Sequence, residues 1–77
     1  MSLQEKFNAC KEAIGKRFPY RDCYIYPHGK MVSAVVENVK WFSDYMFDIF
    51  IKIQFTDGYE ASFVTDGECF YDNTLKK

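Results

Sequence analysis

The strongest constraint on the fold comes from residues 47–72, where each of two Thr-Asp-Gly segments follows a run suited to a strand. In the first run the apolar residues Phe47, Ile49, Ile51, Ile53 and Phe55 alternate with Asp48, Phe50, Lys52 and Gln54. A period of two residues is typical of a strand that buries one face. The segment therefore predicts three antiparallel strands joined by two short turns.

The turn at Thr56-Asp57-Gly58 sets the register of the first predicted hairpin. A two-residue loop would pair Ile53 with Ser62, whereas a three-residue loop pairs it with Ala61. Because a slip of one residue moves every side chain to the other face, the apolar pattern favours the three-residue loop. That loop requires Gly58 at positive φ. The same reasoning predicts a three-residue turn at Thr65-Asp66-Gly67 with Gly67 at positive φ, and a strand after it.

One face of this three-stranded unit is predicted to be the core face. Its members are Ile49, Ile51, Ile53, Phe55, Tyr59, Ala61, Phe63, Cys69 and Tyr71. The opposite face is mainly polar, but it also carries Phe50 opposite Val64, with Phe70 one strand further on. These three side chains have no obvious intrachain cover, because a single helix covers only one face of a sheet. We expect them to lie in an interface, unless the 39–46 connection or the tail folds back over them.

Residues 3–17 predict one amphipathic helix. Ser2 and Glu5 have the spacing of a capping box. Apolar residues recur at helical spacing, at Leu3, Phe7, Cys10, Ile14 and Phe18. Pro19 prevents the helix from continuing. We expect this stripe to cover the core face of the sheet.

Residues 22–38 predict a further hairpin that turns at Pro27-His28-Gly29. A two-residue loop would pair Ile25 with Val32 and Cys23 with Ala34, and a three-residue loop would pair Tyr24 with Val32. The first is favoured because it gives the valine-rich strand a continuous core face. Pro27 cannot donate to a ladder, so the first strand is expected at an edge.

The expected architecture is therefore α+β: one N-terminal amphipathic helix on a single antiparallel sheet of about five strands, in one domain of residues 1–77. The 39–46 connection contains Trp41, Phe42 and Tyr45, so it is either tucked under the end of the helix or offered to a partner. The polar tail, residues 73–77, is expected to fray.

Composition and charge limit the classes of partner and the compartment that we expect for the chain. No apolar run approaches the roughly 20 residues that span a bilayer, so we expect a soluble chain and no membrane partner. Three cysteines without a CxxC spacing predict free thiols in a reducing cytoplasm. Residues 1–40 hold seven Lys and Arg against four Asp and Glu, whereas residues 41–72 hold one against seven, a balance of −6. An acidic sheet disfavours nucleic acid and favours a basic partner, although it is also what an ordinary solubilising surface looks like.

No constellation of residues predicts catalysis. Cys23 and His28, the single histidine, lack a third group to orient the imidazole, and a zinc site with Cys69 would lack a fourth ligand. Phosphate-binding and nucleophile-elbow motifs are absent from the sequence. We therefore expect neither an enzyme nor a cofactor.

Two hypotheses follow for the function. The first is a small cytoplasmic protein-binding factor, regulatory or inhibitory, that acts through an acidic, aromatic sheet surface; free-standing factors of this size are often encoded by phages and other mobile elements. The candidate partner-binding residues are Trp41, Phe42, Tyr45, Phe50, Val64, Phe70, Asp57, Glu60, Asp66 and Glu68. The second is a structural homodimer that uses the same face. Nucleic-acid binding is a distant third, because the RNP motifs are absent and the sheet is acidic.

Overall fold

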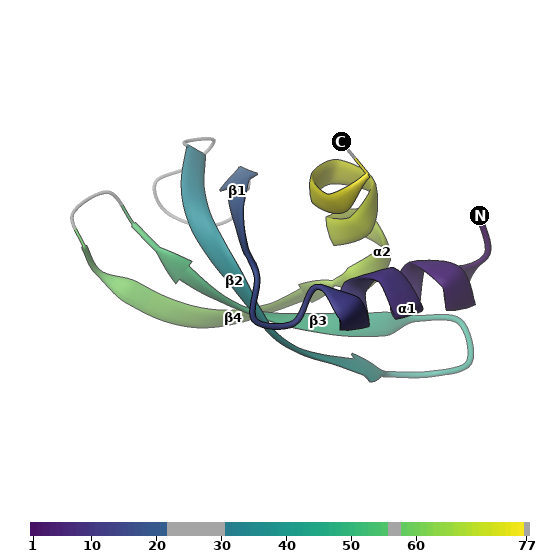
Figure 1. Cartoon of the computed structure of the whole chain (residues 1–77). Helices are drawn as coiled ribbons and strands as arrows, with labels where there is room; N and C mark the ends of the chain where they lie inside the picture. The colour runs from purple at the N-terminus through teal and green to yellow at the C-terminus, as the bar shows by residue number, and fades with distance from the viewer. Residues whose placement is uncertain (22–30, 56–57, 77) are drawn as a thin grey trace.

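The computed structural model of the chain describes residues 1–21, 31–55 and 58–76. Within these residues an antiparallel sheet of order β1-β2-β3-β4 is covered on one face by helical segments (Figure 1). The elements are α1 (Leu3–Glu12), β1 (Arg17–Arg21), β2 (Met31–Trp41), β3 (Phe47–Gln54), β4 (Glu60–Asp66), α2 (Gly67–Phe70) and the π-helical turn η1 (Tyr71–Leu75). The predicted α+β class, with an N-terminal helix packed on an antiparallel sheet, is confirmed.

Helix α1 begins as predicted but ends earlier. Its capping box is formed, with Glu5 N donating to Ser2 Oγ at 3.1 Å and Ser2 N donating to Glu5 Oε1 at 3.0 Å. The helix ends at Glu12 rather than at residue 17, because Gly15 takes a φ of +87° and its N–H donates to Val36 O at 2.8 Å. Ile14 consequently leaves the apolar stripe and is exposed, contrary to prediction, while Ala13 is buried.

Strand β1 begins at Arg17, the residue at which the helix was expected to end. Phe18 lies opposite Ala34, and Tyr20 lies opposite Val32. These pairings replace the predicted partners of Ala34 and Val32, because the early end of α1 lets the chain enter the sheet at residue 17. The predicted strand at 22–26 and its turn lie outside the described residues. Pro19, which cannot donate to a ladder, fits the edge position of β1.

Strand β2 is long and carries a bulge. Val36 lies opposite Ile51 and Asn38 opposite Phe50, so Glu37 is the extra residue. The bulge lets Val36 and Val39 both face the core although they are three positions apart. Since β2 continues to Trp41, the connection predicted at 39–46 is reduced to residues 42–46.

The register predicted for β3 and β4 is confirmed. Ile53 lies opposite Ala61, Ile51 opposite Phe63, and Phe50 opposite Val64. The turn between the strands is closed by Phe55 N, which donates to Tyr59 O at 2.8 Å, and Gly58 has a φ of +90° as predicted. The apolar alternation therefore identified the buried face of β3 correctly.

The predicted fifth strand is wrong, and the described sheet has four strands. Asp66 caps a helix instead of starting a turn: its Oδ1 accepts a hydrogen bond from Glu68 N at 3.1 Å, and Gly67 does not adopt a positive φ. The chain then turns back over the core face, and Phe70 is buried to 2% exposure against Phe18 and Tyr20. Phe70 is therefore a core residue and not part of an outer surface.

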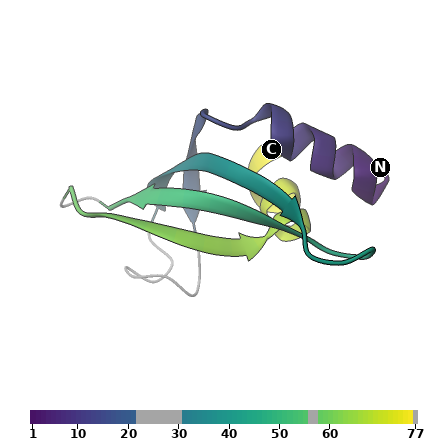
Figure 2. The same cartoon turned by 90° about the horizontal axis from the view of Figure 1, so that it is seen from below.

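The C-terminal segment extends the helical layer. Residues 73–75, which were predicted to fray, belong to η1, and Leu75 packs against the core. Lys6 of α1 joins the two ends of this layer through Glu68 and Asp72, at 2.9 and 3.2 Å. Seen from below, strands β2, β3 and β4 lie in front of the C-terminal helical turn (Figure 2).

The core lies between the sheet and this helical layer. The largest fully buried side chains are those of Phe47, Phe70, Ile49, Ile51, Ile53, Val36 and Cys10. Tyr59 and Cys69, predicted for the core face, are exposed, because Tyr59 lies beyond the helical layer and Cys69 lies on a helix. No helix of the described residues is long and apolar enough to cross a membrane.

Candidate functional site

The hairpin between β2 and β3 ends in a tight loop whose side chains project from the end of the sheet. Phe42 N and Ser43 N both donate to Met46 O, at 3.0 and 3.1 Å. Tyr45 N donates to Ser43 Oγ at 3.2 Å. These bonds satisfy three loop N–H groups within the hairpin, so the loop is held in one shape. We refer to residues 41–46 as the aromatic tip.

Large apolar side chains are concentrated on the aromatic tip. Phe42 is 72% exposed and Tyr45 is 84% exposed, and Met46 is also exposed. Of the eight exposed large hydrophobic residues in the described part of the chain, four lie between Trp41 and Met46. Single exposed apolar residues are normal, but a cluster of this kind is typical of an interaction site.

Trp41 fixes the base of the tip to the core. Its ring stacks on Phe7 of α1, with centroids 4.8 Å apart, and meets the ring of Phe47 edge-on at 5.5 Å. Phe7 and Phe47 also contact each other edge-on at 5.4 Å. The three rings join α1, β2 and β3, so the tip is anchored on two sides and not only by its own hairpin.

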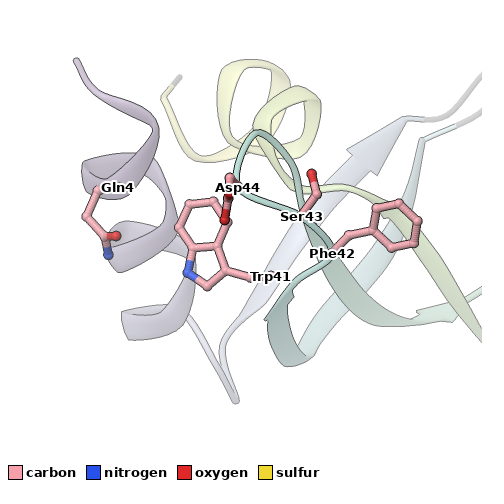
Figure 3. A pocket seen from close by; sticks show the side chains of 5 residues that line it. All are labelled: Gln4, Trp41, Phe42, Ser43 and Asp44. Carbon is pink, nitrogen blue, oxygen red and sulfur yellow. The ribbon is translucent and has the colours of Figure 1, made fainter.

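An open hollow lies between the aromatic tip and the first turn of α1 (Figure 3). It is lined by Gln4, Trp41, Phe42, Ser43 and Asp44, and we call it the tip hollow. In Figure 3 the side chain of Asp44 overlaps the indole of Trp41 and Gln4 lies to one side of it on α1, whereas the ring of Phe42 points away from all three. The hollow thus combines an aromatic surface with polar side chains.

The outer face of the sheet is more polar than predicted. Arg17 donates to Ser33 Oγ at 2.7 Å and to Gln54 Oε1 at 3.2 Å. Glu37 accepts from Ser62 at 3.2 Å and lies 3.9 Å from Lys52. The apolar part of the outer face is therefore small. It consists of Val64, which is exposed, and Phe50, which is half-buried.

Phe50 is further covered by a cation. Lys40 Nζ lies 5.7 Å from the centroid of the Phe50 ring. A cation over an aromatic face is a favourable contact that also hides the ring from a partner. The outer face is therefore a weaker candidate for binding than the aromatic tip.

The predicted partner-binding residues separate into three groups. Trp41, Phe42 and Tyr45 come together at the tip, while Phe50 and Val64 lie on the outer face and Phe70 is in the core. The acidic residues do not form one surface: Asp66 caps α2, Glu68 pairs with Lys6, and Glu60 lies at the far end of β4. Asp57 lies outside the described residues.

Four residues of the site were missed in the sequence. Met46, Gln4, Ser43 and Asp44 all border the tip or its hollow. Ser43, Asp44 and Met46 could have been found from the connection itself, since each is next to one of its aromatic residues. Gln4 lies nearly 40 positions away in α1, and no local pattern links it to the hairpin.

Neither described thiol, Cys10 nor Cys69, has the lowered pKa that makes a cysteine a nucleophile. Burial raises the pKa of the Cys10 thiol to about 11. The carboxylate of Asp66, which accepts a hydrogen bond from Cys69 Sγ at 3.4 Å, raises the pKa of the Cys69 thiol. Reactive cysteines have lowered pKa values. The described residues also contain no group of three or more His, Cys, Asp or Glu side chains placed to hold a metal ion, and Cys23 and His28 lie outside them.

Comparison with known proteins gives no assignment. No protein-family model matches the chain, and no curated protein and no solved structure is significantly similar to it.

Proposed function

We propose that this chain is a small protein-binding factor of the cytoplasm, regulatory or inhibitory, that acts by occupying a partner's surface with its aromatic tip. It carries out no chemistry of its own. The observation that carries the proposal is the exposure of Phe42 and Tyr45 at the apex of a hairpin whose base is anchored in the core.

The energetics favour a buried state for the tip. Fully burying a large apolar side chain contributes roughly 1.5–3 kcal/mol. The free chain forgoes most of this at Phe42, which is 72% exposed, and about half of it at Met46, which is 47% exposed. Aromatic residues that dominate binding energies are rigid and sit in pockets of the partner. Since the stacking of Trp41 on Phe7 holds the base of the tip, little ordering entropy is lost when the tip binds.

The charge around the tip favours a protein over a lipid surface. Asp44 lies within the tip and Asp48 follows it at the start of β3. Cytoplasmic membrane surfaces are anionic and attract basic segments, so these carboxylates oppose insertion into a bilayer. The same two carboxylates suit a basic protein surface.

The test compares proteins captured from the source cell by three immobilised forms of the chain. The native chain and the Val64→Ser variant, altered on the outer face, should retain the same partner. The double variant Phe42→Ser with Tyr45→Ser should lose it. All three should unfold cooperatively at similar temperatures, because the changed side chains are exposed. Equal retention by the tip variant would overturn the proposal.

Two further readouts separate the competing occupants. Light scattering at micromolar concentration reports whether the native chain is a dimer and whether the tip variant is a monomer, in which case the tip contacts a second copy. Sedimentation with vesicles of anionic phospholipid reports membrane binding. If the native chain is a dimer and the tip variant a monomer, the tip binds a second copy of the chain. If the native chain sediments with the vesicles and the tip variant does not, the tip binds a membrane. Either result would contradict a foreign protein as the partner.

A further inference from the structure

We propose that the tip hollow receives an arginine side chain of the partner. The inference deepens the protein-binding function proposed above and rests on it for its biological meaning, but binding in the hollow can be tested separately. It follows from the pairing of an aromatic surface with an unneutralised carboxylate, and from the acceptors that surround them.

Trp41 supplies the surface on which a planar cation can lie. Phe7 stacks on one side of the indole, and Phe47 meets it edge-on. Even so, Trp41 remains 40% exposed, and both it and Asp44 line the hollow (Figure 3). Tryptophan is the best of the aromatic side chains for binding a cation over its face.

Asp44 supplies a charge that nothing in the described chain neutralises. No cation of the described residues lies within ion-pair distance of its carboxylate, and the carboxylate makes no hydrogen bond with them. Lys6, the basic residue of the adjacent helical turn, is held by Glu68 and Asp72 at 2.9 and 3.2 Å. Lys40 is engaged over Phe50. Among the described residues, an incoming cation therefore has no competitor within ion-pair distance of Asp44.

The polar groups around Trp41 present acceptors to the hollow. Gln4 Nε2 donates to Asn8 Oδ1 at 3.0 Å, which leaves Gln4 Oε1 as an open acceptor. Ser43 Oγ accepts from Tyr45 N, and it retains a further lone pair. Together with the two oxygens of Asp44 these atoms suit a ligand that is rich in donors and has no acceptor.

Guanidinium fits this set better than ammonium. It is planar and can stack on an indole, and its fixed N–H groups bind a carboxylate in a bidentate manner. A lysine ammonium is compact and strongly hydrated, so it makes poorer use of the flat surface of Trp41. The hollow should therefore prefer arginine to lysine, and should reject a neutral group of the same shape.

The test titrates the native chain with three blocked tripeptides: acetyl-Gly-Arg-Gly-amide, its lysine analogue and its citrulline analogue. Citrulline keeps the shape of arginine but removes the charge. Because the chain has a single tryptophan, one indole N–H resonance in a nitrogen-correlated NMR spectrum reports on the hollow. The arginine peptide at millimolar concentration should shift this resonance and the amide of Asp44 in a saturable way. The lysine peptide should bind more weakly, and the citrulline peptide should leave both resonances in place.

Asp44→Asn is the decisive variant, because it keeps the shape of an exposed side chain and removes the charge. It should weaken binding of the arginine peptide about tenfold or more, which is the scale expected for one charge-assisted pair. The matched control is Asp48→Asn, which changes a carboxylate on the outer face of β3 and should leave binding unchanged. Equal shifts with citrulline and arginine, or equal binding by Asp44→Asn and the native chain, would overturn the proposal.

The outcome is separable from that of the capture experiment. If Phe42→Ser with Tyr45→Ser keeps the partner but the arginine peptide binds as expected, the tip is not the anchor and the hollow stands. If the partner is lost with the tip but the peptide does not bind, the tip functions without an arginine and the inference about the hollow is wrong.

Discussion

Gly67 lies against the ring of Phe47 so closely that no side chain fits between them. A Cβ placed on Gly67 would collide with Cε2 and Cδ2 of that ring and would lie 2.9 Å from its Cζ. Phe47 is fully buried, and because protein interiors are close-packed its ring cannot move aside without displacing its neighbours. Glycine is thus required here by packing, whereas the Thr-Asp-Gly sequence had suggested that it was required by a turn.

This contact predicts that Gly67→Ala destabilises the chain although alanine is the better helix former. Overpacking of a full core typically lowers the free energy of unfolding by about 1–3 kcal/mol. Urea denaturation of the variant measures the loss. Phe47→Leu should partly restore stability in the Gly67→Ala background while destabilising the native chain, so the two changes will be non-additive. Strict additivity would contradict the contact.

Gly58 predicts a loss of another kind. Its φ is +90°, and a Cβ there meets none of the described atoms within 4 Å, so the strain is confined to the backbone. Gly58→Val should lower the free energy of unfolding by more than about 1 kcal/mol. Gly58→Asn should lower it less, because asparagine tolerates the left-handed region better than a β-branched residue does. Equal losses, measured by the same denaturation experiment, would argue against a left-handed conformation.

Ile51 tests the assignment of the sheet faces. It is fully buried under the helical layer, so Ile51→Ala should lower the free energy of unfolding by about 2–5 kcal/mol. The matched control on the neighbouring strand is Val64→Ala, which alters an exposed side chain and should cost under about 0.5 kcal/mol. A melting temperature of Ile51→Ala close to that of the native chain would show that the buried and exposed faces of the sheet had been assigned the wrong way round.

Cys10 predicts a loss of stability at alkaline pH. Burial raises its thiol pKa from 9.0 to about 11, so between these values the thiol ionises in the unfolded chain before it does so in the folded one. The free energy of unfolding should therefore be unaffected below pH 9 and should fall as the pH rises from 9 toward 11. Denaturation across this range measures the slope.

Cys10→Ala should reduce that slope, whatever its effect on stability at neutral pH. Lys6 contributes a separate loss in the same direction, because its hydrogen bond to Glu68 raises its pKa above 10.5 and the contribution disappears only at higher pH. Comparison of the two chains just above pH 9 therefore isolates the thiol. Identical slopes would show that Cys10 is not protected from ionisation.

The hairpin of β3 and β4 could be predicted because two independent signals agreed. The alternation in β3 chose the buried face, and Gly58 provided the only register that kept apolar residues opposite one another. The hairpin predicted at residues 22–38 lacked such agreement, because its turn allowed either a two-residue or a three-residue loop. The end of α1 depends on Gly15 donating to Val36, a contact between distant segments that no local pattern reveals.

The prediction of a fifth strand after Gly67 was wrong for a chemical reason. Asp66-Gly67 is as good a helix start as it is a hairpin turn, since the aspartate side chain can cap the N–H of Glu68. What decides between them is Phe70, which fills the space over Phe18 and Tyr20 only if the chain turns back as a helix. The aromatic residues of the tip were predictable as a group, but the hollow was not, because Gln4 reaches it from α1.

The helical layer has a consequence for the nascent chain. Lys6 meets Glu68 across a separation of 62 residues, so α1 leaves the ribosome long before the segment that completes its packing. At typical synthesis rates the interval is roughly 3–12 s. During that time Leu3, Phe7 and Cys10 face a sheet that is still being made. The core can close only after α2 has been made, because Phe70 is one of its buried residues, and until then the apolar stripe of α1 lacks part of its cover.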